Sequence, residues 1–149
     1  MKIPIKLLPH ASKLYPPKYE TEGAAGFDLR AAIAQPASIP PMSIGRVPLG
    51  FVLALLPGWE LQVRPRSGLS FKGIFCQLGT VDPDYRGEVS AILHNTTDKP
   101  FVIEPGDRIA QGVICPIVRA EWDVVTGLGE TARGANGFGS TGMSDEGPR

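Results

Sequence analysis

The chain has 149 residues, enough for one domain of ordinary size and too few for two well-buried ones. Its 18 glycines and 15 prolines interrupt helices, so the composition argues against an all-helical bundle. The 15 basic and 15 acidic residues give a formal net charge of zero, so the chain lacks the basic field that holds a nucleic-acid polymer. Any anion that the protein binds must therefore be held by a local group of residues.

The sequence gives no sign of a membrane span or a signal peptide. The longest uninterrupted apolar run, 51–56, is far shorter than the roughly 20 residues that cross a bilayer. Residues 1–10 contain no apolar stretch of signal-peptide length. Cys76 and Cys115 have no metal-type spacing, and we interpret them as two buried thiols in a reducing cytoplasm. We therefore expect a cytoplasmic protein without a membrane partner.

Short runs of alternating apolar and polar residues, bounded by Gly and Pro, predict many short strands. In chain order the expected strands are Ile3–Leu7, Ile44–Val52, Trp59–Arg64, Glu88–Asn95, Lys99–Ile103 and Ile109–Val118. The best helical candidate is the short segment Ser67–Lys72. Turns at roughly ten-residue spacing favour an all-β fold, a jelly-roll, β-sandwich or compact barrel.

Residues 127–149 differ from the rest because they are rich in glycine and carry almost nothing that could be buried. They form either a frayed tail or a segment that wraps around a ligand through Arg133 and Phe138. Ordering ten such residues costs on the order of 10 kcal/mol, and one charge-assisted contact returns only about 1.5–3 kcal/mol. We predict a β domain over 1–126 and a flexible C-terminal lid over 127–149, whose contacts form together.

Three polar clusters interrupt the strand pattern. In the first, Asp28 and Arg30 stand two residues apart, so on a strand they share a face and can form an ion pair. The second, 65–70, follows a strand and either holds an anion at a helical turn or is a simple capped turn. The third, 106–111, reads as a turn that feeds a strand, with Gln111 as an amide facing a pocket.

A fourth cluster, 79–87, is a polar segment that we interpret as a hairpin between two apolar strands. Pro83 biases Asp82 towards extended backbone and favours a turn, so Asp82 and Tyr85 can line one hollow. The alternative is an Asp-Pro turn in which Asp82 bonds its own backbone.

Two other patterns carry no chemistry. Residues 137–142 match the dinucleotide pattern G-x-G-x-x-G, but too few residues follow them to form the helix that receives a pyrophosphate. His10 and His94 are not spaced as metal ligands. A phosphate site in this chain must use arginines, hydroxyls, backbone amides and a loosely held ion.

The polar clusters and the tail, taken in order, read AGFDLRA, PRSGLS, GTVDPDYRG, GDRIAQ and RGANGFGSTG. They resemble the five motifs of the homotrimeric dUTPase family. The resemblance implies hydrolysis of dUTP to dUMP and pyrophosphate, which limits uracil in DNA and supplies dUMP for dTMP synthesis. It also implies a β jelly-roll assembled as a homotrimer, with active sites between subunits.

The resemblance assigns roles around the hairpin. Asp82 matches the general base that deprotonates the water attacking the α-phosphorus, a role that requires the ionised carboxylate. Tyr85 matches the tyrosine that packs beneath deoxyribose and excludes a 2′-hydroxyl. The backbone of Thr80 and Val81 would bind the uracil edge.

The resemblance also assigns the phosphate-binding residues. Arg66, Ser67 and Gly68 match a turn that cradles the phosphates, contributed by a neighbouring subunit. Asp28 matches the acid that holds, through water, a Mg²⁺ ion chelated by the phosphates, and Gln111 an amide near the same phosphates.

The tail completes the implied site. Arg133 would reach the γ-phosphate and Phe138 would stack on uracil. Gly139 and Ser140 would close over the phosphate chain, which makes the tail a lid that excludes water.

The chain departs from the family pattern at two points. Cys76 stands where many members carry an Asn that helps to read uracil, and the segment 65–82 is shorter than we expect for bacterial relatives. Both departures lie in the part of the chain that would select the base, so they affect base selectivity more than phosphate chemistry. The alternatives are a dCTP deaminase-like enzyme and a catalytically silent nucleotide-binding trimer.

Overall fold

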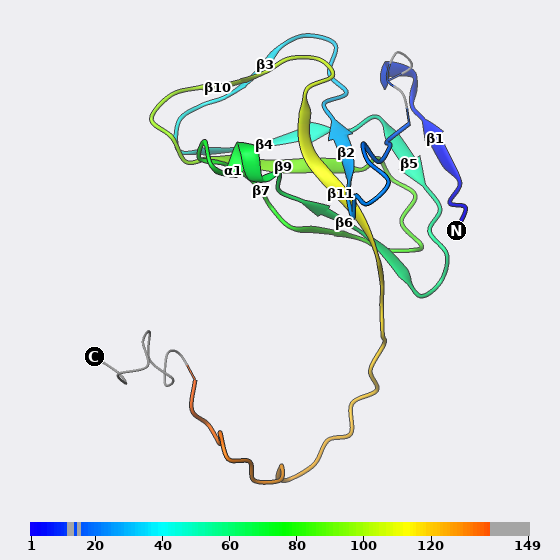
Figure 1. Cartoon of the computed structure of the whole chain (residues 1–149), viewed down its shortest axis with the longest axis vertical. Helices are drawn as coiled ribbons and strands as arrows, with labels where there is room; N and C mark the ends of the chain where they lie inside the picture. Colours follow the sequence, from blue (N-terminus) through cyan, green and yellow to red (C-terminus); the bar gives the residue numbers. More distant parts are fainter. Residues whose placement is uncertain (12–13, 15, 138–149) are drawn as a thin grey trace. The chain divides into compact units, whose positions relative to one another are not determined.

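The computed structural model describes residues 1–11, 14 and 16–137 (Figure 1). It is built almost entirely of strands. The elements, in chain order, are β1 (Ile5–Leu7), the short 3-10 helix η1 (Pro9–Ala11), β2 (Phe27–Arg30), β3 (Ala37–Ile39), β4 (Ser43–Pro48), β5 (Phe51–Leu53), β6 (Trp59–Arg64), α1 (Ser67–Ser70), β7 (Ile74–Cys76), β8 (Gly79–Val81), β9 (Ser90–Asn95), β10 (Phe101–Ile103) and β11 (Arg108–Pro116). The all-β fold with one short α-helix is therefore confirmed.

Two larger antiparallel sheets form the body of the fold. The first has the strand order β2-β11-β6-β8, and the second has the order β4-β9-β7. Two smaller pairs, β1-β5 and β10-β3, complete it. Strands that neighbour one another in these sheets are mostly distant in sequence, as expected for a jelly-roll.

The core lies between the strands because alternate residues of each strand point inward. Leu61 and Val63 of β6 join Ala91 and Leu93 of β9 in a single buried apolar cluster. Burying one Leu side chain contributes about 1.5–3 kcal/mol, so this alternation fixes the register of both sheets. The polar residues of the same strands lie on the outer faces, except for Asn95 of β9, which is buried.

The segment 44–52, expected as one strand, is divided into β4 and β5. Gly50 interrupts it with a φ of 75°, a backbone conformation that other residues rarely adopt. A side chain at Gly50 would also collide with the Cβ atoms of Ala11 and Ala32. The prediction of one continuous strand was wrong because the alternating pattern runs through the turn without a break.

The segment 79–87 is not a hairpin between paired strands. Its incoming strand β8 pairs with β6, whereas the outgoing strand β9 pairs with β4 and β7. The loop between them therefore crosses from one sheet to the other. We call residues 82–88 the crossing loop.

A compact unit covers Met1–Val118, and a second unit begins at Arg119. Residues 119–136 are exposed. The domain boundary expected between residues 126 and 127 stays a prediction. Within the described part of the chain, none of the helices has the length and apolar character needed to cross a membrane.

Candidate active site

Four of the predicted site residues meet in a small polar pocket of about 300 Å³. Asp28 comes from β2, Arg66 and Ser67 from the turn between β6 and α1, and Gln111 from β11. The register of the sheet brings them together, because Gln111 pairs with Asp28 on one side and with the end of β6 on the other. Residues 26, 20 and 108 also line this pocket, which we call the anion pocket.

Asp28 is held by two arginines. Its carboxylate Oδ1 lies 3.1 Å from Nε of Arg66, and Oδ2 lies 3.3 Å from a terminal guanidinium nitrogen of Arg108. The Asp28 side chain is only 13% exposed, so both contacts are partly shielded from solvent. The expected ion pair between Asp28 and Arg30 was wrong, since strand spacing alone ignored the arginines on neighbouring elements.

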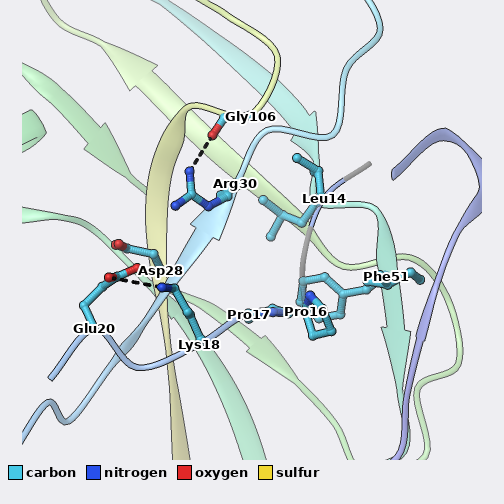
Figure 2. A pocket seen from close by; sticks show the side chains of 11 residues that line it. Leu14, Pro16, Pro17, Lys18, Glu20, Asp28, Arg30, Phe51 and Gly106 are labelled. Carbon is cyan, nitrogen blue, oxygen red and sulfur yellow. Dashed lines mark hydrogen bonds and ion pairs between the residues drawn. The ribbon is translucent and has the colours of Figure 1, made fainter. Parts of the chain in front are cut away.

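Arg30 turns away from Asp28 and donates to the backbone carbonyl of Gly106 at 3.1 Å. Figure 2 shows this bond at the wall of a second pocket, of about 430 Å³, which shares Asp28 and Glu20 with the anion pocket. The same view shows Lys18 beside Glu20, with 3.7 Å between the ammonium and the carboxylate. Arg30 therefore supports the turn at Gly106 instead of balancing Asp28.

Gln111 anchors the turn that carries Arg66. Its Nε2 donates to the carbonyl of Pro65 at 2.8 Å. Its Oε1 lies so close to Gly26 that a Cβ there would come within 2.6 Å of it. Gly26 thus leaves room for the Gln111 amide. This amide both lines the pocket and holds the turn with Arg66 in place.

Arg108 is a site residue that the sequence interpretation missed, although it lies within the quoted GDRIAQ motif. Besides its contact with Asp28, its backbone carbonyl accepts a hydrogen bond from Arg66 at 2.8 Å. The signal that could have revealed it is its place directly before the expected strand Ile109–Val118, three residues before Gln111. Two guanidinium groups on one carboxylate give the pocket cationic donors with the geometry that suits phosphate oxygens.

The first residues of α1 add backbone donors beside Arg66. Arg66 precedes the helix with extended backbone, and its carbonyl accepts from Leu69 and Ser70. The first N–H groups of an α-helix have no acceptor within the helix. In α1 these are the N–H groups of Ser67 and Gly68. The predicted turn therefore forms, and it presents a hydroxyl and amide hydrogens next to a guanidinium.

The crossing loop carries Asp82 and Tyr85. The Asp82 side chain is exposed, and within the described residues no hydrogen bond or ion pair engages its carboxylate. Instead its backbone carbonyl accepts from the N–H of Tyr85 at 3.2 Å. The Tyr85 hydroxyl donates to the carbonyl of Glu88 at 3.2 Å, and the ring is 45% exposed. The alternative in which the Asp82 side chain bonds its own backbone is absent from the described structure.

Thr80 and Val81 lie on β8, at the end of the strand order of its sheet. Val81 is buried beneath the sheet, and Thr80 is exposed. Because β8 pairs only with β6 among the described strands, its other edge presents backbone donors and acceptors. Such an edge can bind the polar rim of a planar ring.

The anion pocket and Asp82 lie far apart within one chain. Val81 pairs with Leu61, so Asp82 continues towards the start of β6, whereas Arg66 lies beyond its end. Six strand steps at about 3.3 Å each place Asp82 roughly 20 Å from Arg66 along β6. One chain therefore does not bring the predicted base to the predicted phosphate-binding turn.

Cys76 belongs to the core. It is 6% exposed and joins the main apolar cluster from β7. Burial raises the pKa of its thiol to about 11. Since the side chain points into the core, it offers no polar group for reading a base.

The predicted tail residues are only partly described. Arg133 is exposed, and its Nε donates to the carbonyl of Asn136 at 3.0 Å. Phe138, Gly139 and Ser140 lie outside the described residues. The described residues contain no cluster of three or more His, Cys, Asp or Glu side chains that could cage a metal ion.

The fold and the two sets of side chains define a jelly-roll protein equipped for anionic ligands, with an arginine-lined pocket and an exposed carboxylate on the crossing loop. The chain belongs to the dUTPase family, whose model matches residues 13–142. It is 54% identical over 132 residues to the deoxyuridine 5'-triphosphate nucleotidohydrolase of Rhizobium etli, covering 85% of each chain. It is 50% identical over 147 residues to that of Helicobacter pylori, covering 97% of this chain and 99% of the relative.

Solved structures show the same fold. The dUTPase of Staphylococcus bacteriophage 80alpha, determined with dUPNHPP, superposes with a TM-score of 0.85 at 24% identity. The match covers 95% of this chain and 99% of the phage chain. A dUTPase from phage phi11 of S. aureus, described with a structural Mg(II) ion, matches with a TM-score of 0.76 at 19% identity over 85% of this chain and 98% of the phage chain.

Proposed function

We propose that the chain hydrolyses dUTP to dUMP and pyrophosphate. The observation that carries this proposal is the anion pocket, which Asp28, Arg66, Ser67 and Gln111 line together. Membership of the dUTPase family and the names of relatives at about 50% identity support the same reaction. The resulting enzyme is a dUTP diphosphatase.

Asp82 acts as the general base in this proposal. Its carboxylate is exposed and has no partner among the described residues, so it can accept a proton from a water molecule. That water attacks the α-phosphorus, the bond to the bridging oxygen breaks, and pyrophosphate leaves. General-base catalysis of this kind contributes about 10²–10⁴-fold to the rate.

The phosphates lie in the anion pocket. Arg66 and Arg108 supply charge-assisted donors, and the N–H groups of Ser67 and Gly68 supply neutral ones. The Gln111 amide keeps the turn with Arg66 in place through its bond to Pro65. These donors stabilise the negative charge that develops on the leaving pyrophosphate.

A Mg²⁺ ion fits this site only as a partner of the substrate. Each Asp28 oxygen already contacts an arginine and keeps one further lone pair, which can accept a hydrogen bond from a water on the metal. Without a cluster of protein ligands in the described part of the chain, the phosphates and water would be its main ligands. When bound, the ion neutralises phosphate charge.

The base and sugar bind at β8 and the crossing loop. The open edge of β8 offers the backbone of Thr80 and Val81 to the uracil rim. Tyr85 provides a wall beneath deoxyribose that leaves no space for a 2′-hydroxyl. A site built for a hydrogen-bonding rim rejects bases whose polar groups do not match it.

The complete site forms between subunits of a homotrimer. Asp82 and Arg66 of one chain lie about 20 Å apart along β6, so both reach one triphosphate only when two copies contribute. A cyclic assembly repeats this head-to-tail contact and closes the ring. The tail then serves as a lid: Arg133 reaches the γ-phosphate, Phe138 stacks on uracil, and Gly139 and Ser140 close over the phosphates.

A hydrolysis panel tests the proposed reaction. With Mg²⁺ present, dUTP should yield pyrophosphate, whereas dCTP, dTTP and UTP should be poor substrates. In water enriched in oxygen-18, the heavy atom should enter dUMP and not pyrophosphate. Ammonia release from dCTP would show a deaminase, heavy oxygen in pyrophosphate would refute attack at the α-phosphorus, and no hydrolysis would show a silent binding protein.

A further inference from the structure

The Tyr85 ring lies directly against the backbone of Gly87. A Cβ built on Gly87 would come within 2.9 Å of Tyr85 Cε2, and closer still to Cζ and the hydroxyl oxygen. Real Cβ atoms essentially never approach other heavy atoms this closely, so an alanine at 87 must displace the ring or the loop. The ring occupies the space that any side chain at this position would need.

The backbone at Gly87 does not itself require glycine. Its φ lies outside the left-handed region, unlike that of Gly50 or Gly106. An alanine there introduces no backbone strain of the kind that a positive φ would cause. The close approach of the Tyr85 ring is therefore the structural reason for a glycine at this position.

The end of the crossing loop that the Tyr85 ring contacts is anchored to the body of the fold. The Tyr85 hydroxyl donates to the carbonyl of Glu88 at 3.2 Å. The Glu88 carboxylate in turn accepts from the N–H of Gly50 at 2.9 Å and lies 2.9 Å from Nε2 of His10. Val89, next along the chain, is 2% exposed and pairs with Phe51 through a backbone bond of 3.0 Å. The loop end that holds the ring is thus tied to the body of the fold.

We propose that Gly87 is a positioning residue that sets the choice of sugar, by leaving room for the Tyr85 ring against the anchored end of the crossing loop. This inference rests on the proposed dUTP hydrolysis, in which Tyr85 excludes a 2′-hydroxyl. In this role Gly87 acts only through the ring. An added methyl group moves the wall and opens the space that a ribose needs.

The test compares Gly87→Ala with wild type by the ratio of kcat/KM for dUTP to that for UTP. The ratio should fall about tenfold or more, the scale on which shape discriminates a small group. Gly23→Ala is the matched control, because Gly23 has open space around it and no positive φ. An unchanged ratio in Gly87→Ala, or an equal loss with both substrates, overturns the proposal.

A double variant separates the ring contact from a general loss of structure. In the Tyr85→Ala background the ring is gone, so adding Gly87→Ala should change the ratio no further, which is the signature of two residues acting as a unit. Independent, multiplying effects of the two changes overturn the proposal.

Nuclear magnetic resonance of the wild-type trimer tests the contact without activity. The Gly87 Hα should show a cross-peak to the Tyr85 ring protons and a chemical shift that returns to an ordinary value in Tyr85→Ala. Absence of both refutes the contact even if dUTP is hydrolysed. If both are present and dUTP is not hydrolysed, the proposed function fails while the packing stands, and the role in sugar choice falls with it.

Discussion

Two inactive variants should restore activity to one another when their subunits mix. Asp82→Asn removes the proposed base and should lower turnover by about 10²–10⁴-fold. Arg66→Ala removes the proposed phosphate donor from the other end of β6. Because the two residues lie about 20 Å apart in one chain, the proposed site takes them from different subunits. A site is intact when an Arg66→Ala chain supplies Asp82 and an Asp82→Asn chain supplies Arg66.

Random mixing in equal amounts makes about one quarter of the sites intact in a cyclic assembly. The assay unfolds and refolds the two variants together and follows pyrophosphate release from dUTP, compared with the same variants refolded separately. The matched control mixes wild type with a chain carrying both substitutions. Its activity should fall from about one half to about one quarter of wild type when subunits exchange. Exchange without recovery in the first mixture would refute a site shared between chains.

Three further predictions follow from named contacts. Deletion of residues 133–149 should leave the body of the chain folded by circular dichroism, because these residues lie outside the compact unit Met1–Val118, and should greatly lower turnover. Unfolding of the truncated chain would contradict the proposal that the tail is a lid. Asn95→Ala should lower the free energy of unfolding by about 3 kcal/mol or more, because Asn95 is 1% exposed and its amide bonds several backbone groups around it. Denaturant titration measures this loss, and a loss below about 1 kcal/mol would show that the hydrogen bonds are dispensable. Cys76 should react with thiol reagents far more slowly than Cys115 at pH 8, because burial raises the pKa of Cys76 to about 11 and keeps its thiol protonated. Labelling followed by mass spectrometry measures the two rates, and equal rates would contradict the prediction.

The alternating pattern predicted the longer strands, but not the three-residue strand β7. Trp59–Arg64 forms as expected, and β9, β10 and β11 lie within or close to the expected ranges. The division at Gly50 was missed, because alternation continues through a turn that depends on one positive φ and on tight contact with Ala11. Neither property is visible in a pattern of apolar residues.

The candidate site was predictable where it follows the order of motifs along the chain. Asp28, Arg66 and Gln111 meet because antiparallel pairing brings β2 and the end of β6 to either side of β11. The partners of Asp28 were not predictable from spacing, since they depend on which strands become neighbours. For the same reason Arg30, two residues away, turned out to bind a turn.

The separation of Asp82 from the anion pocket along β6 means that, in the proposed homotrimer, the working unit is the assembly and not the single chain. Dilution that releases single copies of such an assembly would separate Asp82 from the phosphate-binding turn that serves it. Specific activity should then depend on protein concentration, rising with the fraction that is associated. A cell could thus lose this activity through weakened contact between copies, with every residue that handles the nucleotide still present.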